Sequence, residues 1–148
     1  MADLADLLAF LDAHHVAHLA TSGEGGPHAA PVFFARVGVG ITWISAPHVL
    51  HSRHLADGPA IAASVSPSAP SLGLIEGVQL RGSATAPLDQ HPLRDAWLAR
   101  FPLARPMVTA APDHRFYLLV PTWARLVRTV AGSSRNREWD AAALGGPT

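Results

Sequence analysis

Short β-type segments joined by tight turns constrain the fold of this chain more than any other feature. Residues 16–21 and 28–36 are two such segments, and the stretch between them, Ser22-Gly23-Glu24-Gly25-Gly26-Pro27, is rich in glycine. Glycine adopts positive φ at little steric cost, so this stretch predicts a β-hairpin turn. Further strands are expected at residues 39–44, 60–66, 74–86, 116–120 and 123–130, with Pro121 as a possible break between the last two. Hairpin spacing favours a mainly β fold, an antiparallel barrel of six or seven strands with inserted helices.

Three helices are expected to interrupt the strands. Residues 3–14 carry leucines at positions 4, 7, 8 and 11, which places them on one face of a helix. The other two helices are expected at residues 45–58 and 89–101, with Ser45 as the N-cap of the first and Pro47 in its first turn. We expect one domain over residues 1–130, with residues 131–148 as a C-terminal tail.

Composition excludes several classes of function. The 148 residues include eleven basic and eleven acidic side chains, so the balanced charge gives no support for binding nucleic acid or an anionic membrane. The absence of cysteine excludes disulfides, thiolate nucleophiles and iron–sulfur ligation, and the absence of lysine excludes a Schiff-base lysine. There is no basic leader and no apolar run of about 18 residues, so we expect a cytoplasmic chain without a membrane span.

Residues 43–59 contain the strongest candidate for a binding site. A strand runs there into a short helix that ends at Gly58-Pro59. A helix N-terminus offers unpaired N–H groups and a partial positive charge, and Ser45, His51 and Arg53 would add side-chain donors. The segment therefore predicts a phosphate-binding site. A connecting helix with a solvated His/Arg face remains the alternative.

Other site chemistries have weaker support. His48, His51 and His54 are spaced by three and could share a helix face, but Asp57 is the only acid nearby, and we expect no metal site. The sequence contains no G-x-S-x-G elbow, dinucleotide fingerprint, P-loop or paired carboxylates, so no catalytic residue is assigned.

The aromatic residues divide between core and site. Trp43, Trp97 and Trp123 are expected in the hydrophobic core. Because neighbouring strand residues face opposite ways, one of Phe33 and Phe34 is expected in the core and the other near a cleft or a dimer seam.

The order of these elements over residues 5–130 resembles the pyridoxamine 5'-phosphate oxidase-like FMN-binding split-barrel family. Four segments carry the resemblance: residues 26–34, 45–59, 77–82 and 100–105, the last being similar to a small uncharacterised bacterial subgroup. The resemblance implies a homodimeric split barrel with FMN at the subunit interface. It places Ser45, His51 and Arg53 at the phosphate and the backbone of Pro31, Val32 and Phe33 along the flavin ring.

Two features limit what the resemblance implies. His51 stands where the family commonly has lysine or arginine, and the C-terminal Trp/Arg substrate motif of true pyridoxamine-phosphate oxidases is not found in its usual pattern around Arg137 and Trp139. We therefore do not expect the substrate in the family's name to be the substrate of this chain. Gln79, on the expected long strand, belongs either to the barrel exterior or to the cofactor site, and we include it among the cofactor-binding candidates.

Two classes of function follow. The first is an FMN-dependent oxidoreductase acting on a small molecule, with a deazaflavin as a variant cofactor. Because the flavin carries the redox chemistry, such an enzyme needs no catalytic acid or base of its own. The second is a non-enzymatic flavin- or haem-binding or storage protein with the same fold.

Overall fold

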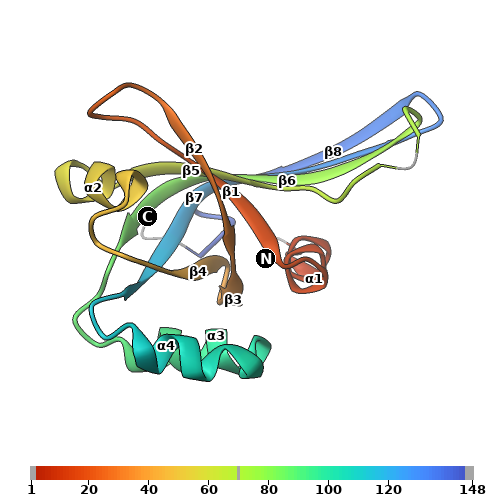
Figure 1. Cartoon of the computed structure of the whole chain (residues 1–148). Coiled ribbons are helices and arrows are strands. Elements are labelled where there is room, and N and C mark those ends of the chain that lie inside the picture. The colour runs from red at the N-terminus through yellow and green to blue at the C-terminus, as the bar shows by residue number, and fades with distance from the viewer. Residues whose placement is uncertain (1–2, 70, 146–148) are drawn as a thin grey trace.

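One strongly curved antiparallel sheet organises the structure, a computed structural model that describes residues 3–69 and 71–145 (Figure 1). Its strands are β1 Val16–Thr21, β2 His28–Phe33, β3 Ala35–Val37, β4 Gly40–Ser45, β5 Ala60–Val65, β6 Leu74–Thr85, β7 Arg115–Val130 and β8 Ser133–Trp139. They follow the order β2-β1-β5-β6-β7-β4-β3, and β8 pairs with β7. The predicted mainly β, antiparallel split barrel is confirmed, with eight strands in place of six or seven.

Helices close the ends and one side of the sheet. They are α1 Ala5–Ala13, α2 Leu50–Asp57, α3 His91–Arg100, the 3₁₀ turn η1 Pro102–Ala104 and α4 Arg105–Ala110. Helices α3 and α4 lie together on one side of the sheet, away from α1 and α2 (Figure 1). The six residues of α4 are too few to show an apolar period, and the sequence analysis missed this helix. Within the described residues, no helix combines the length and apolar character needed to cross a bilayer.

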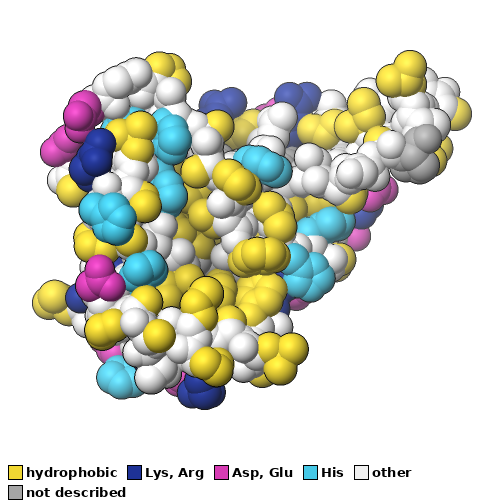
Figure 2. Space-filling view, in the orientation of Figure 1, with side chains coloured by type: hydrophobic (Ala, Val, Ile, Leu, Met, Phe, Trp, Pro, Cys, Tyr) yellow, Lys and Arg dark blue, Asp and Glu magenta, His cyan; other side chains and the backbone are white. Residues whose placement is uncertain are grey.

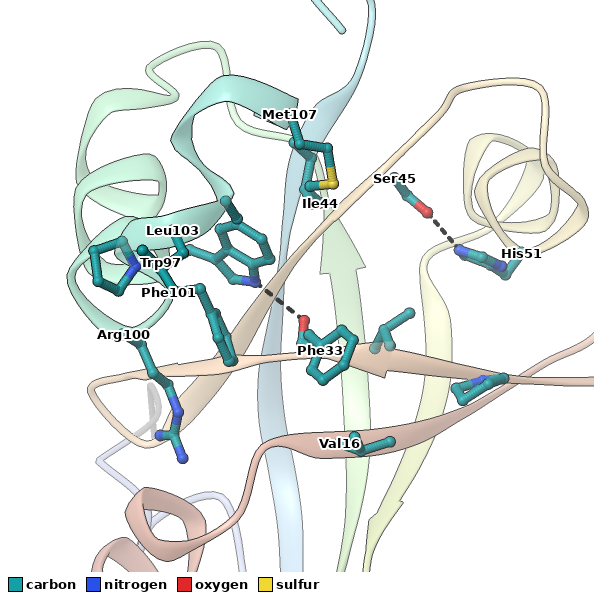
Figure 3. Close-up of a pocket in the computed structure, with 14 residues that line it drawn as sticks. Val16, Phe33, Ile44, Ser45, His51, Trp97, Arg100, Phe101, Leu103 and Met107 are labelled. Carbon is teal, nitrogen blue, oxygen red and sulfur yellow. Dashed lines mark hydrogen bonds between the residues drawn. The ribbon is translucent and has the colours of Figure 1, made fainter. Parts of the chain in front are cut away.

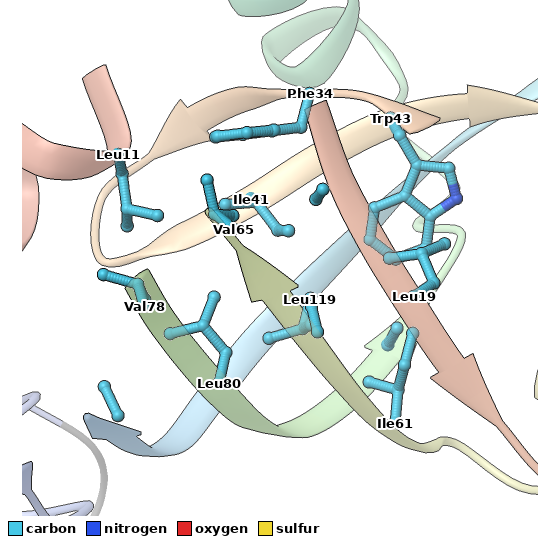
Figure 4. Close-up of a cluster of buried hydrophobic side chains, with 14 of the residues drawn as sticks. Leu11, Leu19, Phe34, Ile41, Trp43, Ile61, Val65, Val78, Leu80 and Leu119 are labelled. Carbon is cyan, nitrogen blue, oxygen red and sulfur yellow. The ribbon is translucent and has the colours of Figure 1, made fainter. Parts of the chain in front are cut away.

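The concave side of the sheet forms the main core. Apolar side chains from six strands, from α1 and α2 and from the β2–β3 junction meet there, among them Leu11, Phe34, Trp43, Leu80 and Leu119 (Figure 4). A second, smaller cluster holds α3 and α4 against β3, β4 and β7, and its buried members are Ala35, Leu93, Trp97, Leu98, Val108 and Phe116. Burial of both clusters supplies the main driving force for folding.

Strands β6 and β7 pair along most of their length through a β-bulge. Arg81 pairs with Trp123 and Gly82 with Pro121, so Thr122 has no opposite residue. Proline lacks a backbone N–H and is tolerated at bulges, and a bulge bends its strand and increases its twist. One continuous strand therefore bends at Pro121, whereas the sequence alone left open whether Pro121 divides it into two strands.

Two other strand boundaries differ from expectation. The strand expected over residues 28–36 stops at Phe33 and resumes at Ala35. Strand β8 lies in the range expected as a tail, and a two-residue turn with positive φ at Ala131 and Gly132 joins it to β7. All residues of β8 except Trp139 are exposed, so this strand has no apolar alternation in the sequence.

Gly82 sits so close to β7 that a side chain there should destabilise the fold. A Cβ at this position would lie 2.1 Å from the Val120 carbonyl oxygen and 2.8 Å from the Pro121 Cα. We expect Gly82→Ala to lower the free energy of unfolding by about 2 kcal/mol or more, because only backbone movement relieves the clash. Urea denaturation followed by circular dichroism measures this change.

Gly58→Ala is the matched control. A Cβ there meets nothing within 4 Å, and the backbone is extended with φ −169°. Its free energy of unfolding should stay within about 0.5 kcal/mol of the wild type. Equal denaturation midpoints for the two variants would contradict the packing described for β6 and β7.

Candidate functional site

A pocket of about 830 Å³ lies between the edge strand β2, the end of β4, the start of α2 and the α3–η1–α4 side (Figure 3). This volume is within the range of small-molecule sites, roughly 300–1,000 Å³. Of its fourteen lining residues, eleven are apolar and three are polar: Ser45, His51 and Arg100. Figure 2 shows hydrophobic side chains gathered around the central hollow of this face. The pocket is therefore apolar, with Ser45 and His51 at one end and Arg100 at the opposite end (Figure 3).

Ser45 and His51 form a hydrogen-bonded pair at one end of the pocket. Ser45 is the last residue of β4, His51 lies in the first turn of α2, and Ser45 Oγ is 2.6 Å from His51 Nε2. The prediction that Ser45 caps a helix is wrong, because the helix begins at Leu50 with Val49 as its N-cap. Ser45 instead continues the ladder opposite Arg115 and directs its hydroxyl at the imidazole.

The environment of His51 favours the neutral imidazole. Burial lowers the pKa of His51 below its ordinary value, and the charges of His28 and His54 lower it further. The His28 ring is stacked at 6.3 Å from the His51 ring. The neutral ring has two tautomers. In one, Ser45 donates its hydroxyl proton to Nε2; in the other, Nε2–H donates to Oγ and the hydroxyl proton can reach a ligand.

His54 attaches α2 to the β1–β2 hairpin. Its buried ring lies 2.8 Å from the Glu24 carbonyl oxygen through Nε2 and 2.9 Å from Thr21 Oγ1 through Nδ1. The carbonyl can only accept, so Nε2 carries a proton, and in the neutral ring Nδ1 accepts from Thr21. A Cβ at Gly23 would lie 2.8 Å from the ring, so this turn needs glycine to pack on His54. His54 therefore helps to hold α2, and with it His51, at the pocket.

The sequence candidates for cofactor binding separate into two groups. Five of the seven line the pocket: Pro31, Val32, Phe33, Ser45 and His51. Within residues 3–69 and 71–145, no group of three or more His, Cys, Asp or Glu side chains is placed to hold a metal ion.

Arg53 and Gln79 lie outside the pocket. Arg53 donates from Nη1 to the His48 carbonyl oxygen at 3.1 Å, and its Nη2 is 3.5 Å from a Glu24 carboxylate oxygen. Gln79 lines a second pocket of about 310 Å³ on the outward face of β1, β5 and β6. Trp123 lines the same pocket beneath the Arg81 guanidinium, so its predicted place in the core is wrong, whereas Trp43 and Trp97 are buried as expected.

The sequence analysis missed the helical side of the pocket. Trp97, Phe101, Leu103, Ala104 and Met107 line it from α3, η1 and α4. The four-residue spacing of Trp97 and Phe101 indicated a helix face, but nothing in that spacing indicated what the face would meet. This face meets strand β2, where Trp97 Nε1 donates a hydrogen bond to the Phe33 carbonyl oxygen at 3.1 Å. The two residues are 64 positions apart in the chain.

Arg100 closes the pocket at the end opposite Ser45 and His51 (Figure 3). Its Nη2 donates to the backbone carbonyl oxygens of Asp12 and His14, and its guanidinium lies 5.5 Å from the centre of the Phe34 ring. Burial lowers the pKa of Arg100, and the nearby Asp12 charge partly opposes that shift. The side chain thereby fixes the end of α3 to the segment between α1 and β1.

The donors at the Ser45–His51 end suit a phosphate group. They are a hydroxyl, an imidazole and the first-turn N–H groups of α2, which have no partner within the helix. The Ser52 hydroxyl is buried on α2 without a hydrogen-bond partner among the described residues, but it does not line the pocket. A phosphate at this end would meet neutral donors unless His51 takes up a proton.

Comparison with known proteins agrees with the fold. Residues 5–128 match the family model of pyridoxamine 5'-phosphate oxidase. A heme-binding protein from Mycobacterium smegmatis is 24% identical with a TM-score of 0.78, and the match covers 97% of this chain and 61% of that one. A FAD-binding protein from Mesorhizobium loti is 15% identical with a TM-score of 0.67, covering 93% and 95% of the two chains.

A third similar structure is that of a protein described as a member of the same family. It is a Clostridium acetobutylicum protein related to general stress protein 26 of B. subtilis, of the pyridoxinephosphate oxidase family. It is 13% identical with a TM-score of 0.71, covering 95% of this chain and 96% of that one. At these identities the structural similarities show a common fold, and no curated protein sequence matches the chain.

Proposed function

The chain belongs to the pyridoxamine 5'-phosphate oxidase family, and on that premise we propose that it binds FMN in the 830 Å³ pocket and is an FMN-dependent oxidoreductase acting on a small molecule. One observation carries the proposal: the Ser45–His51 pair forms a polar end on a pocket lined mainly by apolar residues. FMN has the matching form, a planar ring system with a phosphate at the end of its side chain. When bound, the flavin supplies the electron transfer, and the protein binds it, orients it and excludes water.

The proposed phosphate position is the end of β4 and the first turn of α2. Ser45 and His51 would hold the phosphate there together with α2 backbone N–H groups. Arg53 does not line the pocket, so its side chain would have to move from its place near the His48 carbonyl oxygen to join them. The contribution of Arg53 is therefore a separate proposal, which an Arg53→Ala variant tests.

The proposed ring position is the edge strand β2. This strand ends the described sheet order, and its pairing with β1 uses one side of its backbone. Pro31, Val32 and Phe33 lie on this strand and line the pocket. The bond from Trp97 to the Phe33 carbonyl oxygen fixes the strand relative to α3, so the ring would meet a preformed surface.

We also propose a homodimer with the cofactor between the two copies. Gln79 lies outside the pocket of its own chain, on an outward face that also carries Ala20, Ala29 and Ala62. A contact of Gln79 with the cofactor would then be made in the pocket of the second copy. Sedimentation velocity at micromolar concentration should give the mass of a dimer, and a monomer alone would contradict the interfacial site.

Titration with FMN and riboflavin tests the phosphate position directly. Riboflavin has the same ring without the phosphate, so FMN should bind more tightly to the wild type. Ser45→Ala should weaken FMN by up to about tenfold through loss of one hydrogen bond and leave riboflavin affinity unchanged. Ser133→Ala, on the exposed part of β8, is the matched control and should change neither. Equal affinities for FMN and riboflavin in the wild type would contradict the phosphate site.

The same titration decides the role of Arg53. If its guanidinium binds the phosphate, Arg53→Ala should weaken FMN by roughly ten- to a hundredfold, as expected for a charged hydrogen bond. Unchanged affinity would remove Arg53 from the phosphate site and leave the roles of Ser45 and His51 in place. Spectra of the same samples with haem or a deazaflavin would show whether either alternative cofactor binds.

The buried histidine predicts that FMN affinity depends on pH. In the free protein, burial and the neighbouring histidines lower the pKa of His51. A bound phosphate favours the protonated ring and raises that pKa, so affinity should be greatest at low pH and fall as pH rises through the pKa of the complex. Dissociation constants measured from about pH 5 to 8.5 should show this fall.

Two controls separate the effect of His51 protonation from other effects of pH on FMN affinity. His51→Lys keeps a positive charge at position 51 over this range, so its FMN affinity should depend less on pH. The pH dependence of riboflavin affinity measures the effects that do not involve the phosphate. The second ionisation of the phosphate itself, near pH ~6, is common to both proteins. Identical FMN profiles for wild type and His51→Lys would mean that His51 binds the phosphate, if at all, as a neutral donor.

A further inference from the structure

We propose that the α3–η1–α4 side of the pocket is a substrate subsite for an uncharged, largely apolar ring compound. This inference rests on the proposed function, because it takes FMN to occupy the Ser45–His51 end and β2. The subsite consists of the side chains of Trp97, Phe101, Leu103 and Met107, with Phe33 facing them from β2 (Figure 3).

Apart from the Arg100 guanidinium, the one polar side-chain group on this side is already engaged in a hydrogen bond. Trp97 has one side-chain donor, Nε1–H, and it is bonded to the Phe33 carbonyl oxygen. Phe101, Leu103 and Met107 offer no conventional hydrogen-bond donor. A charged substrate held here would lose its water without gaining partners from these residues, which is strongly unfavourable.

Arg100 is the one charged residue among the described lining residues, and its contacts are structural. Its Nη2 bonds two backbone carbonyl oxygens, of Asp12 and His14, and its guanidinium stands over the Phe34 and Phe101 rings. These contacts keep Nη2 directed at the α1–β1 segment. An anionic substrate would have to bind the remaining guanidinium donors, of which Nε is buried and has no partner among the described residues, and a charged probe tests that outcome.

Aromatic and flexible side chains give the subsite its shape. The Phe33 and Phe101 rings meet edge-on at 5.6 Å, and Phe101 packs 4.9 Å from Trp97. Three apolar residues at the rim are exposed: Phe33 by 60%, Leu103 by 95% and Met107 by 54%. Exposed apolar side chains grouped around a cavity mark a binding surface, and rings pack well against such edges.

A pair of probes with the same ring system separates the two kinds of substrate. 2-Naphthol is uncharged, and 2-naphthalenesulfonate carries a permanent negative charge. Isothermal titration of each into FMN-loaded and FMN-free protein measures binding without any turnover. We expect 2-naphthol to bind the FMN-loaded protein about tenfold more tightly than the sulfonate, because the sulfonate loses hydration at an apolar surface.

Leu103→Glu and Leu88→Glu form a matched pair of variants. Both leucines are almost fully exposed, at 95% and 97%, so neither change should disturb the fold, but only Leu103 lines the pocket. Leu103→Glu should weaken 2-naphthol by about tenfold and leave FMN affinity unchanged, whereas Leu88→Glu should change neither.

Three outcomes would overturn the inference. They are no binding of 2-naphthol, sulfonate binding as tight as that of 2-naphthol, or equal effects of the two variants. If FMN still binds in these samples, the proposed function stands and only the substrate class is wrong. If the wild type binds no FMN, the proposed function fails, and the substrate role of this surface fails with it.

Discussion

The close pairing of β6 with β7 at Gly82 is the constraint on which the rest of the structure depends. These two strands carry β5 on one side and β4 and β8 on the other, so their path sets the shape of the whole sheet. At the bulge beside Pro121 the backbones come so near that no side chain fits at Gly82. The bend gives the sheet a concave side, where the main core is buried, and an outward side, where the second pocket opens.

The site follows from what this curved sheet brings together. Strand β4 ends at Ser45 and α2 returns His51 to it, which creates a polar end with buried neutral donors. Helix α3 meets β2 through Trp97 and Phe33, which creates a largely apolar side with Arg100 as its one charged residue. An elongated ligand with one anionic end and a planar body matches this division, and a second apolar molecule can share the pocket with it.

Local patterns in the sequence predicted most of the fold. The glycine-rich turn and the alternating strands identified the β1–β2 hairpin and β4 to β7, and the leucine spacing identified α1. Strand β8 escaped notice because both of its faces are mainly exposed, so it has no apolar period. Helix α4 escaped notice because it is short.

The sequence predicted only those pocket residues that lie close to one another in the chain. Ser45 and His51 were proposed from one strand–helix segment, and Pro31, Val32 and Phe33 were implied by the family resemblance; the structure brings all five to one pocket. The helical side depends on contacts between residues far apart in the chain, such as Phe33 and Trp97, which no local pattern reveals. The start of α2 was misplaced because the ladder partner of Ser45, Arg115, lies 70 positions away and cannot be read from the local sequence.

The absorption spectrum of the purified protein, with the chromophore released by denaturation and identified by mass, tests the central claim most directly. The proposed function predicts an oxidised-flavin spectrum, present on purification or after incubation with FMN, and a released molecule with the mass of FMN. A haem spectrum, a deazaflavin, or a protein that stays colourless after incubation with FMN would contradict it.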